Sequence, residues 1–256
     1  MADGWAAGRI ALVTGATSGF GEAMARRLIA AGAKVIATGR RVDRLQGLAD
    51  ELGTTDLLTR ELDVRSAASI DALLPSLPPE FQAIDVLYNN AGLALGLGKA
   101  HEALLSDWET MIETNVTGLV RVTRAVLPGM VARRHGHVIN LGSVAGHEVY
   151  PGGAVYCATK HAVDAITRGL RMDVLGTGVR VSTVDPGMVE TEFSVVRFRG
   201  DRERADRVYR DMTPLTPDDI ADTVLWVATR PPHVNVDEVI IKPTDQASAT
   251  QVHRQK

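Results

Sequence analysis

Short runs of β-branched and aliphatic residues recur along the chain at intervals that predict seven buried strands. Between them lie longer segments in which apolar residues repeat every three or four positions, the spacing of one helix face. Strands that alternate with helices require parallel crossover connections. We therefore predict an α/β protein with a doubly wound, parallel seven-stranded sheet and helices on both faces. The predicted strands are Ile10 to Val13, Val35 to Ala37, Leu57 to Leu62, Val86 to Tyr88, Val138 to Leu141, Val179 to Val184 and Val236 to Ile241, and the clearest helices are Ala23 to Ala30, Leu104 to Val126, Val155 to Leu175 and Ile220 to Ala228.

The alternation of strands and helices is interrupted once, after the sixth strand. The segment Phe193 to Thr216 includes a run of mixed charge from Arg197 to Asp211. It is either a solvated helical excursion or a substrate lid at about residues 190–215, because loops at this end of such sheets often cover the ligand. The sequence has no linker, repeat or low-complexity tract. We therefore predict one domain spanning residues 1–256.

Composition and charge exclude several classes of function. The 256 residues are 45% hydrophobic, and 28 Lys and Arg against 31 Asp and Glu give a net charge of −3. Such a balance provides no broad field for binding nucleic acid or an anionic membrane. There is one cysteine, Cys157, no apolar run long enough to span a membrane and no export signal in residues 1–8. These features predict a cytoplasmic protein whose partner is a small molecule.

Small or polar residues end six consecutive predicted strands. Open α/β sheets bind ligands outside the carboxyl ends of their strands, so these residues are expected to meet at one edge. The sequence therefore predicts a binding site there. The six residues are Gly15, Arg40, Asp63, Asn90, Ser143 and Pro186.

The segment Thr14 to Gly21 follows the first strand, opens a helix and contains three glycines. Glycines permit a tight turn and close approach of the backbone to a pyrophosphate, which the N–H groups of a helix N-terminus bind. The spacing differs from the common G-x-G-x-x-G pattern. A plain strand-to-helix turn is therefore the alternative to a phosphate site.

The end of the second strand distinguishes two nicotinamide cofactors. An acidic residue there would accept hydrogen bonds from the ribose hydroxyls of NAD, whereas an arginine would pair with the 2′-phosphate of NADP. The sequence is Thr38-Gly39-Arg40-Arg41, with two guanidiniums and no acid. NADP is therefore favoured, and a solvated pair of arginines is the alternative.

Tyr156 and Lys160 are four residues apart and therefore share one face of a predicted helix. An ammonium near a phenol favours the phenolate and is expected to lower the phenol pKa from about 10. Such a tyrosine can act as a general acid and base. Ser143 ends the fifth strand, where its hydroxyl could steady a substrate oxygen.

Together these motifs resemble the short-chain dehydrogenase/reductase family from about Arg9 to the C-terminus. The resemblance rests on the glycine turn, Asp63-Val64, Asn89-Asn90-Ala91-Gly92, Asn115, Ser143, Tyr156 with Lys160, and Pro186-Gly187. It implies a Rossmann-type fold, a homotetramer or homodimer, and four catalytic residues. Tyr156 would be the general acid/base, Lys160 would lower its pKa and bind the nicotinamide ribose, Ser143 would position the substrate oxygen, and Asn115 would hold a relay water. Asp63 would contact the adenine, and Asn90 would contact the adenine-side ribose region. The expected cofactor-binding residues are Gly15, Thr17, Ser18, Gly19, Phe20, Gly21, Arg40, Arg41, Asp63, Val64, Asn90, Ala91, Gly92, Tyr156, Lys160, Pro186, Gly187, Val189 and Thr191.

A narrower likeness is to the NADP-dependent 3-hydroxy acid dehydrogenases, which act on serine, allo-threonine or malonic semialdehyde. It rests on Gly19 to Glu22, Thr38 to Arg41, Asn89 to Gly96, Asp107 to Glu109, Val196 to Asp201 and Val252 to Gln255. Selectivity for an acid requires a cationic contact, so Arg197 or Arg199 is expected to bind the substrate carboxylate; both would face one side if this stretch is extended. The alternatives are a reductase of another small aldehyde, such as a sulfonated one, and a nucleotide-sensing regulator without turnover.

Several other residues are predicted to be structural. His135 and His137 lack a third ligand at suitable spacing, so no metal site is expected. Cys157 is predicted to be a small packing residue rather than a nucleophile. Trp108 and Trp226 are expected to pack on helices.

Overall fold

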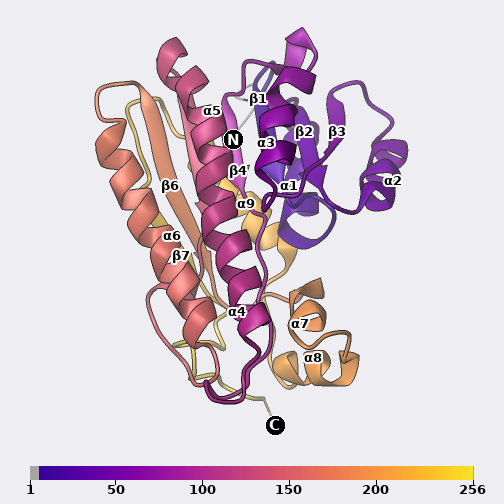
Figure 1. The fold of residues 1–256 in the computed structure, drawn as a ribbon, viewed down its shortest axis with the longest axis vertical. Helices are drawn as coiled ribbons and strands as arrows, with labels where there is room; N and C mark the ends of the chain where they lie inside the picture. The colour runs from indigo at the N-terminus through magenta and orange to yellow at the C-terminus, as the bar shows by residue number, and fades with distance from the viewer. Residues whose placement is uncertain (1–5, 256) are drawn as a thin grey trace.

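The computed structural model describes residues 6–255, which are built around one sheet of seven parallel strands (Figure 1). The strand order is β3-β2-β1-β4-β5-β6-β7, and every neighbouring pair is parallel. The doubly wound α/β fold predicted from the sequence is therefore confirmed. The strands are β1 (Ile10–Thr14), β2 (Lys34–Gly39), β3 (Leu57–Glu61), β4 (Val86–Asn89), β5 (Gly136–Leu141), β6 (Val179–Pro186) and β7 (Glu238–Ile241).

Helices cover both faces of the sheet because side chains alternate along each strand. In β1, Ala11 and Val13 pack into one apolar cluster with α1 (Gly19–Ala30), α2 (Val42–Leu52) and α9 (Pro217–Ala228). Ile10 and Leu12 pack into the opposite cluster with α3 (Ala67–Leu73), α5 (Leu119–Arg133) and α6 (Ala154–Asp173). The short helical turns are η1 (Leu74–Ser76), η2 (Pro79–Phe81) and η4 (Val144–Gly146).

The predicted helix from Leu104 to Val126 is interrupted. It consists of α4 (Leu105–Ile112), a π-helical segment η3 (Glu113–Gly118) and α5, which continues to Arg133 through Pro128. Within η3, the Asn115 side chain accepts a hydrogen bond from Leu93 N at 2.9 Å and donates one to Leu93 O at 2.8 Å. These contacts with a distant segment accompany a widened turn that apolar spacing does not reveal.

Other boundaries move by a few residues. The last strand begins at Glu238 rather than Val236, and the first helix begins at Gly19, before its apolar repeat. Trp226 is not a packing residue as predicted, since it is 49% exposed and the Arg230 guanidinium lies 4.8 Å from its ring centroid.

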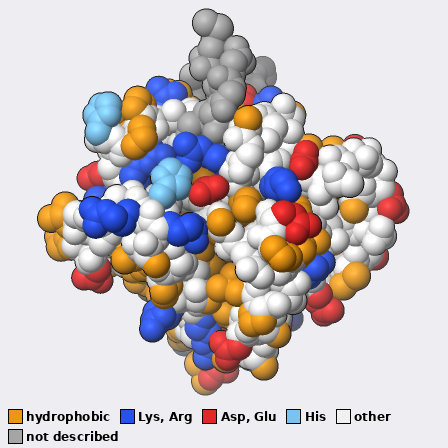
Figure 2. Space-filling model, turned by 90° about the horizontal axis from the view of Figure 1, so that it is seen from above, with side chains coloured by type: hydrophobic (Ala, Val, Ile, Leu, Met, Phe, Trp, Pro, Cys, Tyr) orange, Lys and Arg blue, Asp and Glu red, His pale blue; other side chains and the backbone are white. Residues whose placement is uncertain are grey.

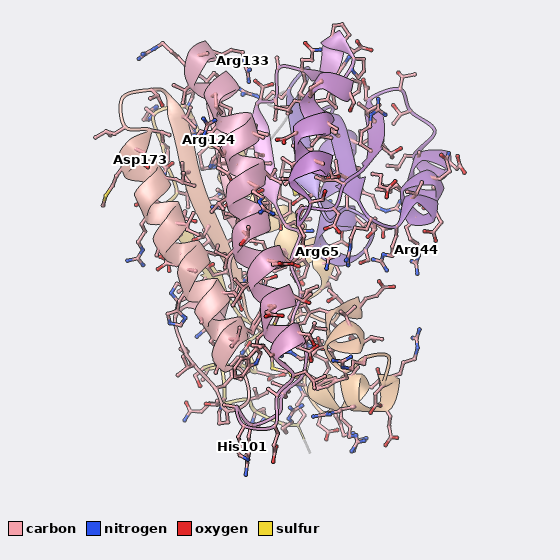
Figure 3. All side chains as sticks on the ribbon, viewed as in Figure 1. Arg44, Arg65, His101, Arg124, Arg133 and Asp173 are labelled. Atoms are coloured by element: carbon pink, nitrogen blue, oxygen red, sulfur yellow. The ribbon has the colours of Figure 1, made fainter. Side chains whose placement is uncertain are left out.

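The excursion after β6 is ordered as two helices, α7 (Glu192–Arg197) and α8 (Arg202–Tyr209). Both lie beyond the carboxyl ends of the strands, beside the start of the long helix that begins with α4 (Figure 1). In Figure 3, His101 marks this end of the molecule and Asp173, the last residue of α6, marks the opposite end. Figure 2 looks onto that opposite end, where acidic, basic and apolar side chains are interspersed. Among residues 6–255, no helix is both long and apolar enough to cross a membrane.

Candidate active site

The carboxyl ends of the strands open into a cavity of about 760 Å³. Most of the residues predicted from the sequence line it, and they come from the ends of six strands and the segments that follow. Gly21, Asn115 and Arg199 do not line it. The predicted residues in its wall are Gly15, Thr17, Ser18, Gly19, Phe20, Arg40, Arg41, Asp63, Val64, Asn90, Ala91, Gly92, Ser143, Tyr156, Lys160, Pro186, Gly187, Val189, Thr191 and Arg197.

The glycine turn at one end of the cavity needs glycine for two reasons. Gly15 and Gly19 have φ angles of +69° and +55°, a region that favours glycine. Gly21 lies under the turn, where a Cβ atom would collide with Gly15 O and with Asn90 Nδ2. Asn90, which follows the neighbouring strand β4, donates through Nδ2 to Thr14 O at 2.9 Å and to Gly15 O at 3.1 Å. These hydrogen bonds fix the turn.

Helix α1 begins at this turn without a side-chain cap, since Ser18 forms no capping hydrogen bond. Ser18, Gly19 and Phe20, at the start of this helix, line the cavity, and a helix N-terminus favours an anion. The bare N-terminus and the tight glycines fit a pyrophosphate.

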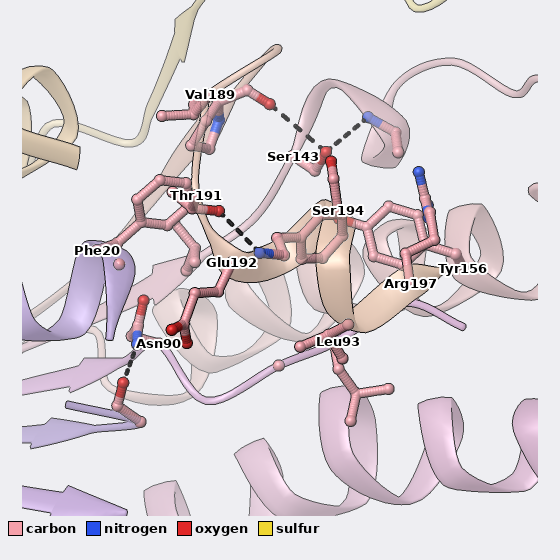
Figure 4. A pocket seen from close by; sticks show the side chains of 18 of the residues that line it. Phe20, Asn90, Leu93, Ser143, Tyr156, Val189, Thr191, Glu192, Ser194 and Arg197 are labelled. Carbon is pink, nitrogen blue, oxygen red and sulfur yellow. Dashed lines mark hydrogen bonds between the residues drawn. The ribbon is translucent and has the colours of Figure 1, made fainter. Parts of the chain in front are cut away.

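Two arginines follow β2, as predicted, and both line the cavity. Arg41 Nη2 donates to Ser18 Oγ at 2.6 Å, and Arg41 Nη1 lies 2.9 Å from a carboxylate oxygen of Glu192. Glu192 was not identified from the sequence. It comes from α7, points towards Asn90 in Figure 4, and crosses the cavity to reach Arg41. The Arg41 guanidinium holds the pKa of Glu192 below its ordinary value.

Asp63 lies at the rim of the cavity beside Arg65, which donates to it at 2.8 Å. This hydrogen bond lowers the pKa of Asp63, so its carboxylate is ionised. Arg65 and Arg44 mark this side of the molecule in Figure 3.

Ser143, Tyr156 and Lys160 meet in the cavity wall. Ser143 Oγ accepts a hydrogen bond from Ala145 N at 3.1 Å, and Tyr156 and Lys160 lie one turn apart on α6. Lys160 Nζ donates to Leu141 O at 2.8 Å. Burial lowers the pKa of Lys160 to about 8.

The expected lowering of the Tyr156 pKa by Lys160 is not what the structure gives. Burial raises the pKa of this phenol above its ordinary value, and the Arg197 guanidinium is the main group that opposes the rise. Desolvation therefore outweighs the nearby positive charge.

The stretch containing Arg197 and Arg199 is not extended, so the two arginines diverge. Arg197 ends α7, whereas Arg199 follows with a positive φ of 54° and pairs with Asp107 at 2.7 Å outside the cavity. The helix ends between the two arginines, and the left-handed conformation at Arg199 redirects the chain, which separates their side chains.

Arg197 lies against Tyr156 in the cavity (Figure 4). Its guanidinium carbon lies 5.0 Å from the ring centroid of Tyr156 and 5.1 Å from that of Phe193. One Nη donates to Tyr150 Oη at 2.7 Å, while the buried Nε has no hydrogen-bond partner among the described residues. Phe193 belongs to the segment that was predicted as a substrate lid, but no spacing in the sequence singles out Phe193 or Tyr150 as a neighbour of Arg197.

Asn115 lies behind the cavity wall. Its amide hydrogen bonds go to Leu93 and to Thr159 Oγ1 at 3.1 Å. Cys157 is fully buried beside Tyr156, and burial raises the pKa of its thiol.

Comparisons with known proteins agree with this geometry. A family model for short chain dehydrogenases matches residues 9–201. A Salmonella typhi protein named NADP-dependent 3-hydroxy acid dehydrogenase YdfG is 57% identical over 247 residues, covering 96% of this chain and 99% of that protein. Serine 3-dehydrogenase of Agrobacterium fabrum is 46% identical over 245 residues, covering 95% of this chain and 98% of that one. The closed form of a serine dehydrogenase complexed with NADP⁺ superposes with a TM-score of 0.92 at 55% identity, covering 96% of this chain and all of the other.

Proposed function

The chain belongs to the short chain dehydrogenase family, and we propose that it is an NADP-dependent oxidoreductase that acts on small 3-hydroxy acids. The observation that carries this proposal is the placement of the Arg197 guanidinium against Tyr156. A cation at this position fits an acidic substrate whose hydroxyl group reacts at Tyr156. The names of the relatives, a 3-hydroxy acid dehydrogenase and a serine 3-dehydrogenase, support the same substrate class.

The cavity residues fit NADP at both ends. The turn from Gly15 to Gly21 and the N-terminus of α1 would hold the pyrophosphate, and Arg40 with Arg41 would hold the 2′-phosphate. Asp63 and Val64 would contact the adenine, while Asn90 to Gly92, Pro186, Gly187, Val189 and Thr191 would line the remaining length. When bound, the cofactor supplies the hydride acceptor or donor for the alcohol carbon.

Tyr156 moves the proton at the substrate oxygen in this proposal. In the reducing direction the phenol, the form that the raised pKa favours, donates a proton to the substrate oxygen. During oxidation of the alcohol the phenolate, whose charge the Arg197 guanidinium favours, accepts the hydroxyl proton. Ser143 Oγ accepts from Ala145 N at 3.1 Å and donates to Pro186 O at 3.5 Å, and it would exchange this long hydrogen bond for one to the substrate oxygen. Lys160 supplies positive charge from the next turn of α6 and would bind the nicotinamide ribose.

Arg197 binds the acidic end of the substrate in this proposal. A guanidinium offers a planar fork that matches a carboxylate, and its aromatic surroundings exclude water that would weaken the pair. Arg199 has no such role, because its charge is directed at Asp107.

A panel of 3-hydroxy acids, hydroxysulfonates and uncharged alcohols, followed by nicotinamide absorbance, tests the proposal. Turnover of 3-hydroxy acids with NADP is expected to exceed that of the other classes. Preference for hydroxysulfonates would assign a different anionic substrate, and NADP binding without any turnover would support a regulator.

We also propose a cytoplasmic homotetramer or homodimer. The single, buried thiol of Cys157 suits a reducing compartment. Exposed apolar side chains on α4 and α5, namely Leu105, Ile112 and Val120, suit contact with a second copy. Light scattering of the purified protein measures the assembly, and a monomer would contradict it.

A further inference from the structure

Behind the cavity wall lies a group of three ionisable side chains that none of the roles above uses. His147 Nε2 is 3.2 Å from Asp185 Oδ2 and 3.4 Å from Glu238 Oε1. Asp185 belongs to β6 and is buried, whereas His147 follows η4 and Glu238 begins β7. A carboxylate can only accept, so His147 Nε2 carries the hydrogen and donates it. Thr183 Oγ1 gives Asp185 Oδ2 a second hydrogen bond at 3.1 Å.

Asp185 and Lys160 flank the same peptide. Lys160 Nζ donates to the carbonyl of Leu141, and the next residue is Gly142. A Cβ atom at Gly142 would overlap Oδ1 of Asp185, so only glycine leaves room for the carboxylate there. Gly142 N also bonds to Val184 O at 2.9 Å, which fixes this peptide to β6. The buried Asp185 and Lys160 side chains therefore contact the same peptide, between Leu141 and Gly142, directly before Ser143.

Several ionisable side chains from neighbouring elements act on Asp185 and Lys160. Burial lowers the pKa of Lys160 to about 8, and the Asp185 charge is the group that opposes this fall. Burial also raises the pKa of Asp185 to about 6, and the hydrogen bond from His147 opposes that rise. Glu238 on β7 acts on Asp185 with the opposite sign, and its carboxylate is engaged by Arg168 of α6 at 3.5 Å. Arg168 in turn pairs with Asp164 at 2.9 Å.

We propose that Asp185, held as a carboxylate by His147, is the counter-charge that keeps Lys160 an ammonium. Asp185 and His147 are then positioning residues, because they act on substrate and cofactor only through Lys160. The inference deepens the proposed function and rests on it for the role of Lys160. The direct prediction concerns the ionisation of one lysine, which can be measured without turnover.

The sign of each effect follows from the charges. Replacing Asp185 with Asn removes a negative charge, so the Lys160 ammonium loses its proton at a lower pH. Replacing His147 with Leu removes one donor to Asp185, so Asp185 takes up a proton at a higher pH and supports the Lys160 ammonium less. His147→Gln keeps an N–H donor without a charge and is expected to preserve most of the effect.

The titration of Lys160 is measured by NMR on protein labelled at the lysine side chains. The sequence has five lysines, Lys34, Lys99, Lys160, Lys242 and Lys256, so the signals are few, and a Lys160→Met variant assigns the relevant one. We expect a midpoint near pH 8 in the unaltered protein. We expect it about one pH unit lower in Asp185→Asn, an intermediate value in His147→Leu, and little change in His147→Gln. NADPH affinity of Asp185→Asn is expected to fall up to about tenfold more than that of the unaltered protein between pH 7 and pH 9.

His135→Gln is the control, because His135 lies away from the candidate site, and its Nε2 accepts from Arg9 at 2.7 Å and is 3.6 Å from Asp85 Oδ1. It should leave the Lys160 midpoint unchanged. An unchanged midpoint in both Asp185→Asn and His147→Leu overturns the inference, and if Asp185→Asn fails to fold, the contrast between His147→Leu and His147→Gln decides. Stabilisation of the unaltered protein, but not of His147→Leu, by zinc chloride would also overturn it in favour of a metal site. Absence of turnover with every alcohol would contradict the proposed function and leave the titration readable.

Discussion

Replacing Arg197 with Met is expected to reduce activity on 3-hydroxy acids far more than activity on uncharged alcohols. Methionine keeps an unbranched stem between Tyr156 and Phe193 but removes the guanidinium, whose carbon lies 5.0 and 5.1 Å from the two ring centroids. One Nη is already used by Tyr150 Oη, while Nε has no partner among the described residues. Nε and the remaining N–H groups are therefore available to a carboxylate.

The size of the loss follows from the number of hydrogen bonds. A hydrogen bond to a charged group contributes about 1.5–3 kcal/mol net. Two such bonds, reduced because the guanidinium is half-buried, give about 2–4 kcal/mol, or about 30- to 900-fold in kcat/KM. Removing Arg197 also takes away the charge that opposes the raised pKa of Tyr156. That second effect acts on every substrate alike, so it cancels when an acid is compared with a neutral alcohol.

The assay compares 3-hydroxypropionate with 1,3-propanediol, which has an uncharged hydroxymethyl group in place of the carboxylate. Initial rates of NADPH formation give kcat/KM for both compounds in the unaltered protein and in Arg197→Met. Arg199→Met is the matched control, because Arg199 pairs with Asp107 outside the cavity. The acid-to-diol ratio should fall in Arg197→Met alone. Equal losses on both compounds, or a lower ratio in Arg199→Met, would refute Arg197 as the carboxylate anchor.

Three further predictions concern the rest of the site. Tyr156→Phe should lower kcat by about 10²- to 10⁴-fold while NADPH affinity, measured by fluorescence, stays within a few-fold, since only the proton-transferring group is lost; substantial remaining turnover would assign the proton to another group. Arg40→Asp should abolish or reverse the preference for NADP over NAD in kcat/KM, whereas the control Arg60→Asp, on β3, should not. If the unaltered protein used NAD as well as NADP, the proposed 2′-phosphate site would be contradicted. Gly21→Ala should lower both the melting temperature and the NADPH affinity, because the added Cβ would collide with Gly15 O. Its control is Gly47→Ala on the exposed side of α2, where a Cβ meets nothing within 4 Å and should stabilise the fold by about 0.5–1 kcal/mol. Equal melting temperatures for the two variants would contradict the close packing at Gly21.

The fold could be predicted because each strand and helix carries its own signal in neighbouring residues. Buried parallel strands read as continuous apolar runs, and glycine with positive φ marks the turn after β1. The carboxyl ends of parallel strands must meet, so residues as far apart as Gly15 and Ser143 could be assigned to one cavity.

The remaining features depend on contacts between distant segments, which periodicity does not encode. The π-helical turn at Asn115 is tied to Leu93, and the ion pair between Arg41 and Glu192 joins residues 151 positions apart. The direction of the Arg197 side chain depends on whether its segment is helical or extended, and the mixed charges of that segment do not distinguish the two. The raised pKa of Tyr156 similarly follows from its burial, which the spacing to Lys160 does not report.

The most direct test of the proposed reaction is transfer of deuterium from the substrate carbon to the cofactor. The protein is mixed with NADP and 3-hydroxypropionate that carries deuterium on the carbon bearing the hydroxyl group, and the reduced nicotinamide is analysed by mass spectrometry. We expect label in NADPH, with much slower labelling when NAD replaces NADP. Unlabelled cofactor after prolonged incubation, or equal labelling of the two cofactors, would contradict an NADP-dependent 3-hydroxy acid dehydrogenase.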